Sequence, residues 1–307
     1  MTSRVDLAVS IPQTFPDHPI APRAIRDYLA RAEKLGFHSA WVVEHTLGAI
    51  PSLEPIQLLT WAAAVTERMR LGVAVLLTAL RSPVHLAKSL ATLDHLSGGR
   101  LVVGVGLGGN PGVYPAFGIS ADRRVARFNE GLRLMTRLWT EPRVSFAGDF
   151  WKMQDAAVEP KPLQKPHPPI WFGAHHPNAL RRTVQMGQGF MGAGSLSTAK
   201  FAEEVKLLTG LLRDAGRDPA TFPIGKRVYI AIDGDRRRAA TRLGKWFGAF
   251  YGRPQMADEV SIWGPPAECV ERLREVVAAG AGLLLLNPVF DEAEHLEQFA
   301  SVLAPAL

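Results

Sequence analysis

The strongest constraint on the fold of this 307-residue chain is a repeat of short apolar runs, each followed by a segment with helical periodicity. Runs of this kind are typical of parallel strands that are buried on both faces. Eight of them are predicted as strands: Val5–Ser10, Ala40–Val43, Gly72–Leu76, Leu101–Val105, Ile170–Phe172, Gly189–Met191, Arg227–Ile232 and Leu283–Leu286. Because every crossover between parallel strands must be right-handed, eight strand–helix units favour a closed barrel over an open sheet. We therefore predict one α/β domain over residues 1–307, a (β/α)8 TIM barrel.

Three stretches are longer than the strand–helix repeat needs, namely 110–122, 141–169 and 233–266. Loops that follow barrel strands form the mouth at the C-terminal face, so these stretches are predicted as insertions there. The second is expected to contain a hairpin that turns at Gly148-Asp149. The third is rich in aromatic residues and is a candidate cover for a substrate site.

Composition limits the partners of the chain. Its net charge is +6, but the basic residues are scattered rather than interleaved with aromatic residues in one patch, which disfavours nucleic acid and favours an anionic small molecule. No apolar stretch is long enough for a membrane span, and the N-terminus lacks a secretory signal. Cys269 is the only cysteine, so no disulfide forms within the chain. We expect a cytoplasmic protein without a membrane partner.

A glycine-rich segment, Gly104 to Gly109, follows the fourth predicted strand and formally matches the dinucleotide fingerprint G-x-G-x-x-G. Asn110-Pro111-Gly112 then prevents the helix that the fingerprint requires. Two interpretations remain open: the glycines let the backbone approach a flat ligand, or they form a tight turn.

Histidines follow two of the predicted strands. Glu44-His45 comes after the second strand, where His45 is a candidate proton donor or acceptor, although a lone histidine at such a position is more often structural. His175-His176 comes after the fifth strand; adjacent side chains of a strand point in opposite directions, so a shared metal is not expected. The helix that starts near Pro177 offers backbone N–H groups to an anion such as phosphate, and Gly192 to Ser195 forms a second loop of small residues. Both are also consistent with ordinary loops.

Motifs for other chemistries are missing from the sequence. It contains no H-E-x-x-H, no G-x-S-x-G and no P-loop, so metal-dependent hydrolysis and serine-type acyl transfer lose support. No metal site is predicted.

The chain resembles the bacterial luciferase-like superfamily of flavin-dependent oxidoreductases over nearly its whole length. The run from Thr92 to Gly106 is the most specific part. The other segments that carry the resemblance are Leu35-Gly36-Phe37, Trp41 to His45, Leu71 to Val75, Arg81-Ser82-Pro83, Lys161-Pro162, Pro166 to Ile170, Ala179 to Arg182 and Gly264-Pro265-Pro266.

The resemblance implies a barrel that binds FMN or the deazaflavin coenzyme F420 at its C-terminal face. The flavin ring would lie against Ala74-Val75, where many members have a non-prolyl cis peptide, and against Leu107-Gly108. The residues that would hold the phosphate are Gly173, Ala174, His175, Gly194 and Ser195. Glu44 and His45 match the acid–histidine pair at the edge of the ring in deazaflavin members, with His45 as the acid or base.

The chain departs from the family pattern at several positions. Deazaflavin-dependent sugar-phosphate dehydrogenases have a glutamate where this chain has Gly109. Many relatives have Gly-Asp-Gly-Trp where this chain has Gly187-Gln188-Gly189-Phe190, and His175-His176 replaces smaller residues of the phosphate loop. The glycine at position 109 puts activity on sugar phosphates in doubt.

The resulting hypothesis is hydride transfer between F420 and a small organic substrate. The first alternative is an FMN-dependent monooxygenase that uses oxygen and receives reduced flavin from a separate reductase. The second is a flavin-binding barrel without catalytic activity. Relatives are often dimers, so the sequence leaves a homodimer open.

Overall fold

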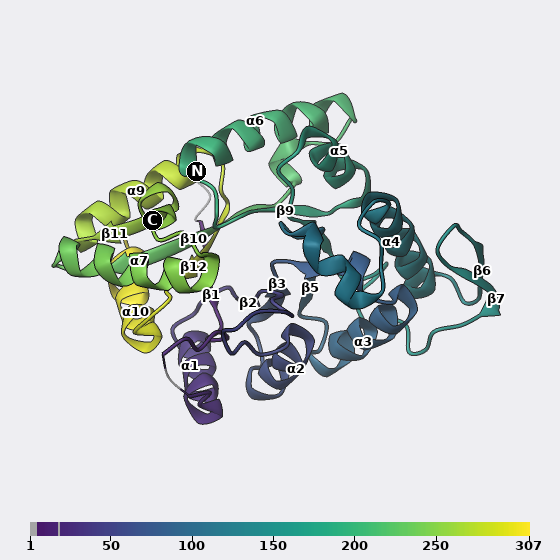
Figure 1. Ribbon diagram of the computed structural model, residues 1–307, viewed down its shortest axis with the longest axis horizontal. Coiled ribbons are helices and arrows are strands. Elements are labelled where there is room, and N and C mark those ends of the chain that lie inside the picture. The colour runs from purple at the N-terminus through teal and green to yellow at the C-terminus, as the bar shows by residue number, and fades with distance from the viewer. Residues whose placement is uncertain (1–4, 18) are drawn as a thin grey trace.

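The computed structural model describes residues 5–17 and 19–307. Its centre is a closed ring of eight parallel strands in which β9 pairs with β10 and β12 pairs with β1 (Figure 1). In order around the ring they are β1 (Asp6–Ser10), β2 (Ser39–Val42), β3 (Arg70–Val73), β5 (Leu101–Gly106), β8 (Ile170–Phe172), β9 (Gly189–Gly192), β10 (Ile224–Ile232) and β12 (Leu283–Asn287). Each of the eight predicted strands overlaps one strand of the ring, and the predicted α/β TIM barrel is confirmed.

Helices cover the outside of the ring (Figure 1). They are α1 (Pro22–Lys34), α2 (Pro55–Val65), α3 (Pro83–Leu96), α4 (Arg124–Thr140), α5 (Pro177–Met186), α6 (Thr198–Asp214), α9 (Pro266–Ala278) and α10 (Glu292–Gln298). Proline opens α1, α2, α3, α5 and α9, because its fixed φ suits the first turn and its missing N–H has no partner there in any case. Short helical turns complete the chain: η1 (Thr78–Leu80), η2 (Pro111–Phe117), η3 (Pro219–Thr221) and η4 (Phe299–Leu303). None of the helices in the described residues is long and apolar enough to cross a membrane.

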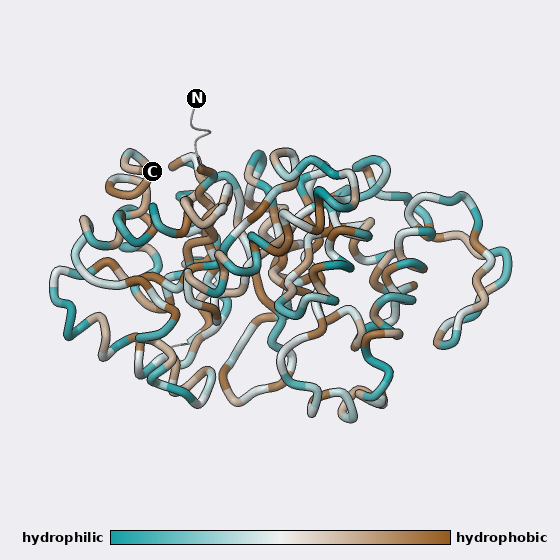
Figure 2. The backbone as a smooth tube through the Cα atoms, turned by 90° about the horizontal axis from the view of Figure 1, so that it is seen from above, coloured by the Kyte–Doolittle hydropathy of each residue, from teal (hydrophilic) through white to brown (hydrophobic). Residues whose placement is uncertain are grey.

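The barrel interior is filled beneath the mouth. Inward-facing side chains of several strands form one buried cluster, in which the rings of Trp41 and Trp171 lie 5.5 Å apart. Gly72 and Gly189 make room for these indoles, because a Cβ at either position would overlap the neighbouring ring. In Figure 2 the hydrophobic segments of the backbone accordingly concentrate in the middle of the molecule. Any small-molecule site must therefore lie above this layer, at the C-terminal ends of the strands.

The insertion over 141–169 contains the predicted hairpin. Strands β6 (Val144–Ala147) and β7 (Lys152–Ala156) pair antiparallel around Gly148-Asp149 and project from the barrel (Figures 1 and 2). The buried carboxylate of Glu130 in α4 holds the turn, since it accepts hydrogen bonds from the backbone N–H groups of residues 149, 150 and 151.

The insertion over 233–266 is folded rather than loop-like. It forms α7 (Arg236–Tyr251), α8 (Met256–Val260) and the strand β11 (Ser261–Gly264), which was not predicted. β11 extends the sheet by pairing with the C-terminal half of β10, outside the ring. The short strand β4 (Leu76–Leu77), which pairs with β5, also forms separately from β3, because the chain bends at residues 74 and 75. α7 carries an aromatic cluster that packs beside the barrel mouth.

Candidate active site

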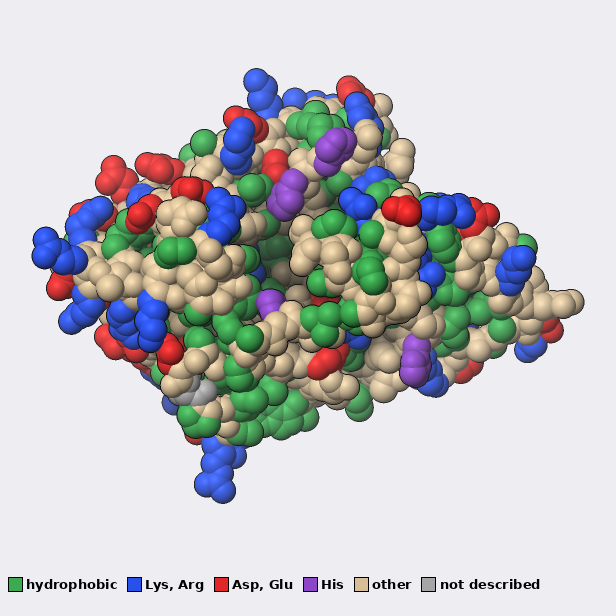
Figure 3. All heavy atoms as spheres, viewed as in Figure 1, with side chains coloured by type: hydrophobic (Ala, Val, Ile, Leu, Met, Phe, Trp, Pro, Cys, Tyr) green, Lys and Arg blue, Asp and Glu red, His purple; other side chains and the backbone are tan. Residues whose placement is uncertain are grey.

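A cleft of about 750 Å³ opens at the C-terminal ends of β3, β5, β8 and β9. A hollow near the centre of the molecule, with histidine side chains around it, is visible in Figure 3. The structure brings all nine residues predicted to bind the cofactor into the lining of this one cleft: Ala74, Val75, Leu107, Gly108, Gly173, Ala174, His175, Gly194 and Ser195.

One wall of the cleft is built around the Ala74–Val75 peptide, which is cis, as the family resemblance implied. The side chain of Val75 packs onto neighbouring glycines: a Cβ on Gly106 would lie 2.5 Å from Val75 Cγ2, and one on Gly173 would lie 3.0 Å from Val75 Cγ1. A Cβ on Gly104 would overlap the carbonyl oxygen of Val73. Gly104 and Gly106 are thus required by protein packing, a reason that neither sequence interpretation contained. Gly109, by contrast, faces open space.

The opposite wall consists of two loops that precede helices. His176 caps α5, where its Nδ1 accepts a hydrogen bond from the N–H of Asn178 at 3.2 Å. Ser197 caps α6, and Gly194 and Ser195 precede it in the cleft lining. The helix start predicted near Pro177 is therefore present, and the small-residue loop also precedes a helix. Helix N-termini carry partial positive charge, so both loops are suited to an anion.

Sequence reasoning missed several polar residues of the cleft. Arg124, Asn178, Arg182, Arg227 and Tyr251 also line it. Within the described part of the chain the Nε atom of Arg182 is buried and has no hydrogen-bond partner, and burial lowers the pKa of its guanidinium. A buried cationic donor without a partner is costly and is suited to an anionic ligand. None of these residues was assigned to the site from sequence, although Arg182 belongs to the resemblance segment Ala179 to Arg182; the five residues come from four different elements.

Glu44 lies at the end of β2 with its side chain only 2% exposed. Its carboxylate accepts hydrogen bonds from the backbone N–H of Leu77 at 2.6 Å and from Arg81 at 2.6 and 3.0 Å. Arg81 also donates to Glu54; burial opposes the charge of its guanidinium, but these two carboxylates together raise its pKa. Glu44 therefore fixes the segment just after the cis peptide.

His45 is half-buried beside the mouth, and it does not line the large cleft as the described residues define it. Its ring lies 4.9 Å from the ring of Phe250, and it packs on Gly48, where a Cβ would overlap Nε2. Gln13 sets the chain direction before it, because its side chain exchanges two hydrogen bonds with the backbone of Val43. Burial lowers the pKa of the His45 imidazole, which favours the neutral ring.

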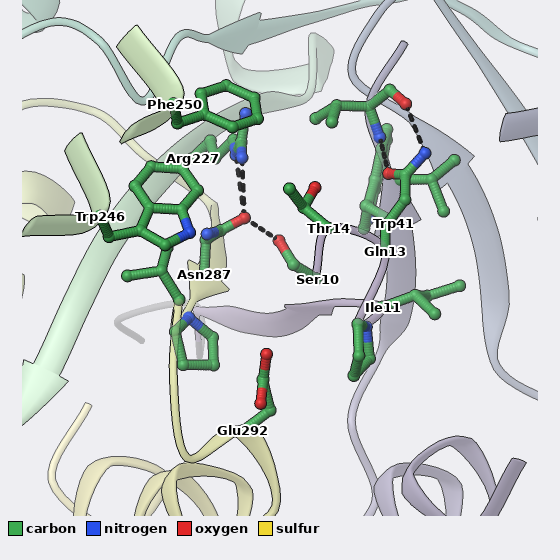
Figure 4. A pocket seen from close by; sticks show the side chains of 15 residues that line it. Ser10, Ile11, Gln13, Thr14, Trp41, Arg227, Trp246, Phe250, Asn287 and Glu292 are labelled. Atoms are coloured by element: carbon green, nitrogen blue, oxygen red, sulfur yellow. Dashed lines mark hydrogen bonds between the residues drawn. The ribbon is translucent and has the colours of Figure 1, made fainter. Parts of the chain in front are cut away.

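A second, smaller cavity of about 40 Å³ lies between the strand ends and α7 (Figure 4). Arg227 lines both cavities and donates two hydrogen bonds to Asn287 Oδ1, which also accepts from Ser10 (Figure 4). Phe250, the neighbour of His45, lines this cavity with Trp246, on which it stacks at 4.7 Å. Phe250 thus lies between the ring of His45 and the aromatic wall of this cavity.

The histidine, cysteine and carboxylate side chains that the structure describes are the possible ligands of a metal ion. Among residues 5–17 and 19–307, no group of three histidine, cysteine or carboxylate side chains is arranged to hold an ion. The adjacent pair His175-His176 has different partners, since Nδ1 of His175 contacts Glu204 and Nδ1 of His176 caps α5.

Comparison with known proteins gives a consistent result. The sequence model of the luciferase-like monooxygenase family matches residues 5–260. An F420-dependent glucose-6-phosphate dehydrogenase from Intrasporangium calvum is 29% identical, over 93% of this chain and 95% of that protein. A monooxygenase from Streptomyces bottropensis has a similar structure, with a TM-score of 0.84 and 27% identity over 98% of this chain and 99% of the other. An F420-dependent secondary alcohol dehydrogenase in complex with an F420–acetone adduct shares the fold, with a TM-score of 0.85 and 20% identity over 99% of each chain.

Proposed function

The chain belongs to the luciferase-like monooxygenase family and is an oxidoreductase, and from this premise we propose that it transfers a hydride between the deazaflavin F420 and a small organic substrate. The observation that carries the proposal is the cleft itself. Nine residues that the family resemblance assigned to the cofactor, from four separate segments of the chain, line one cavity beside the cis Ala74–Val75 peptide. A cavity of about 750 Å³ is of the size that accepts a cofactor.

The residues present fit a flavin-type cofactor in two parts. Ala74, Val75, Leu107 and Gly108 provide a mostly apolar wall for the ring, and the loops at 173–176 and 193–195 provide backbone N–H groups for a phosphate. When bound, the deazaflavin supplies the hydride chemistry, and the protein supplies position and electrostatics.

The charge of the cleft favours F420 over FMN. F420 carries an acidic tail beyond its phosphate, whereas FMN ends at its phosphate. Arg124 and Arg182 line the same cleft in addition to the two loops, and the chain has a net charge of +6. A single phosphate group does not require these two arginines in addition to the loops, whereas a longer anionic tail can pair with them.

His45 is the residue we assign to proton transfer. In the oxidation of an alcohol the carbon gives up a hydride, the C=O bond forms, and the hydroxyl proton must leave to a base. A neutral imidazole can accept that proton and return it in the reverse reaction. Glu44 was predicted as its catalytic partner, but both of its carboxylate oxygens are held by Leu77, Thr46 and Arg81. We assign Glu44 the role of a positioning residue.

The test is a fluorescence titration of the purified protein with F420 and, separately, with FMN. We expect saturable binding of F420 at micromolar concentration, weaker binding of FMN, and hydride exchange with one member of a panel of alcohols and carbonyl compounds. If neither cofactor binds at high micromolar concentration, the proposal is wrong. Cofactor binding without turnover on the panel or with any reductant would instead indicate a flavin-binding barrel without activity.

A second candidate is an FMN-dependent monooxygenase. The 27% identity to a monooxygenase over nearly the full chain favours it. Oxygen consumption with reduced FMN, together with no activity in the presence of F420, would select this alternative.

A further inference from the structure

A buried lysine lies beneath the candidate phosphate loop. Lys226 belongs to β10, and only 2% of the residue is exposed. Its ammonium group donates hydrogen bonds to two backbone carbonyls of that loop, those of Ala193 and, at 2.8 Å, Leu196. Packing leaves little slack: a Cβ on Gly192 would lie 3.2 Å from Lys226 Cδ and 2.5 Å from the ring of Phe201.

These bonds act on the loop from its inner side. Ala193, Gly194 and Ser195 line the cleft, and the carbonyls on either side of Gly194-Ser195 are held by one ammonium group. Because carbonyl and N–H of a peptide unit point in opposite directions, fixing the carbonyls inward restricts where the loop N–H groups can point. Lys226 is therefore placed to set the conformation in which those N–H groups receive an anion.

A buried glutamate, Glu204, orients a side chain of the other candidate phosphate loop, residues 173–176. Glu204 in α6 has a side chain that is 10% exposed, and its Oε1 accepts a hydrogen bond from Nδ1 of His175 at 2.9 Å. This bond fixes the ring orientation and leaves Nε2 as the nitrogen that does not face Glu204. Glu204 Oε2 is buried without a hydrogen-bond partner in the described residues. Glu204 and Lys226 also interact electrostatically, since the negative charge of Glu204 favours the charged form of Lys226.

Stability alone does not explain this arrangement. Burial lowers the pKa of Lys226 to about 7, although Glu204 acts in the opposite direction, so folding the chain with a charged Lys226 is unfavourable. An apolar side chain of similar length would fill the same space without that cost.

We propose that Lys226 and Glu204 are positioning residues that organise the loops 193–196 and 173–176 into one binding site for the phosphate group of the cofactor. This inference rests on the proposed function, because it takes the cleft as the cofactor site. Neither Lys226 nor Glu204 lines the cleft as described. The inference therefore adds two residues outside the cleft to those that determine the affinity for the cofactor.

The experiment compares ligands with and without the phosphate. F420 and FMN are titrated alongside their phosphate-free counterparts, the deazaflavin core and riboflavin, against the wild type, Lys226→Met and Glu204→Gln. We expect Lys226→Met to raise the Kd for the phosphate-bearing ligands about tenfold, because it removes two charge-assisted hydrogen bonds to the loop. Glu204→Gln should raise this Kd about threefold, because it replaces a charged acceptor for His175 by a neutral one. The Kd for the phosphate-free ligands should change less than twofold. Lys206→Met, an exposed lysine of α6, is the matched control and should change neither.

Each outcome separates the roles. Equal weakening for ligands with and without the phosphate, or no weakening in either variant, overturns the inference while the proposed function stands. A wild-type protein that binds none of the four ligands overturns both. A melting temperature of Lys226→Met at or above that of the wild type, together with phosphate-selective weakening, supports a positioning role over a structural one. If Lys226→Met does not fold, Glu204→Gln provides the same comparison.

Discussion

Substitution of Glu44 by alanine separates an anchoring role from a proton-transfer role. The side chain of Glu44 is 2% exposed, and its carboxylate accepts hydrogen bonds from Leu77 and Arg81. Removing one partner of a buried ion pair costs roughly 3–5 kcal/mol, because the other charge stays buried. In this variant Arg81 still pairs with Glu54, and its side chain is a quarter exposed, so we expect a loss of stability at the lower end of that range, about 3 kcal/mol. For a chain of 307 residues the unfolding entropy is roughly 0.6 kcal/mol/K, so the melting temperature should fall by about 5 °C.

The assay is thermal unfolding by circular dichroism, with F420 turnover measured well below the transition. Glu203→Gln is the control, because Glu203 forms an exposed ion pair with Lys200 whose loss should cost less than about 0.5 kcal/mol. We expect Glu44→Ala to lower stability and to weaken cofactor binding through the 74–77 segment. A melting temperature within about one degree of the wild type, combined with turnover that falls by roughly 10² or more, would refute the anchoring argument and restore Glu44 as a catalytic partner of His45.

The same geometry makes four further outcomes testable. His45→Ala should lower turnover by roughly 10² while cofactor Kd stays within about tenfold; unchanged turnover would remove the proton-transfer role. Because burial lowers the pKa of His45, the rate of alcohol oxidation should rise with pH through an inflection below the ordinary histidine value of about 6.5, and this inflection should be absent in His45→Ala. Gly104→Ala should destabilise the fold by more than about 3 kcal/mol, since its Cβ would overlap Val73 O, whereas Gly109→Ala should change the melting temperature by under about one degree; equal effects would contradict the packing argument. Lys226→Met should be more stable than the wild type below pH 7. This difference in stability should shrink as pH rises from 7 toward about 10.4, because over that range Lys226 of the wild type is protonated in the unfolded chain but not in the folded one, so the wild type gains stability. A difference in melting temperature that does not change with pH would contradict this reasoning.

The barrel could be predicted from sequence because its strands are buried on both faces and are therefore continuous apolar runs. Strand β11 lacks this signal: Ser261–Gly264 pairs only with the far half of β10, and its apolar residues lie inside an insertion of mixed composition. The end of β3 was also misplaced, because Gly72–Leu76 is one apolar run in the sequence but two strands in space. Periodicity carries no information about where the backbone of such a run changes direction.

The candidate site was predictable only in part, because its residues come from segments that lie far apart in the sequence. The glycine and alanine positions of the cleft wall stand next to strands and belong to recognisable segments, so resemblance located them. Arg182 belongs to the resemblance segment Ala179 to Arg182 and Arg227 begins a predicted strand, but neither was assigned to the site, because their position in the cleft depends on how α5 and β10 are placed relative to the other strands. The partner of Glu44 was likewise present in the segment Arg81-Ser82-Pro83, but only the structure shows that the two side chains meet.

The two buried acids of the site share one property that bears on its chemistry. Glu44 accepts hydrogen bonds from the segment after the cis peptide, and Glu204 accepts one from His175 in a candidate phosphate loop. Each carboxylate is thus engaged with a protein donor that it orients, and neither lines the large cleft as the described residues define it. Both carboxylate oxygens of Glu44 accept hydrogen bonds, so Glu44 cannot bind and release a proton in each turnover without releasing one of these donors. Under the proposed function we therefore assign the proton that accompanies hydride transfer to His45, because burial lowers the pKa of its imidazole beside Phe250 and so favours the neutral ring.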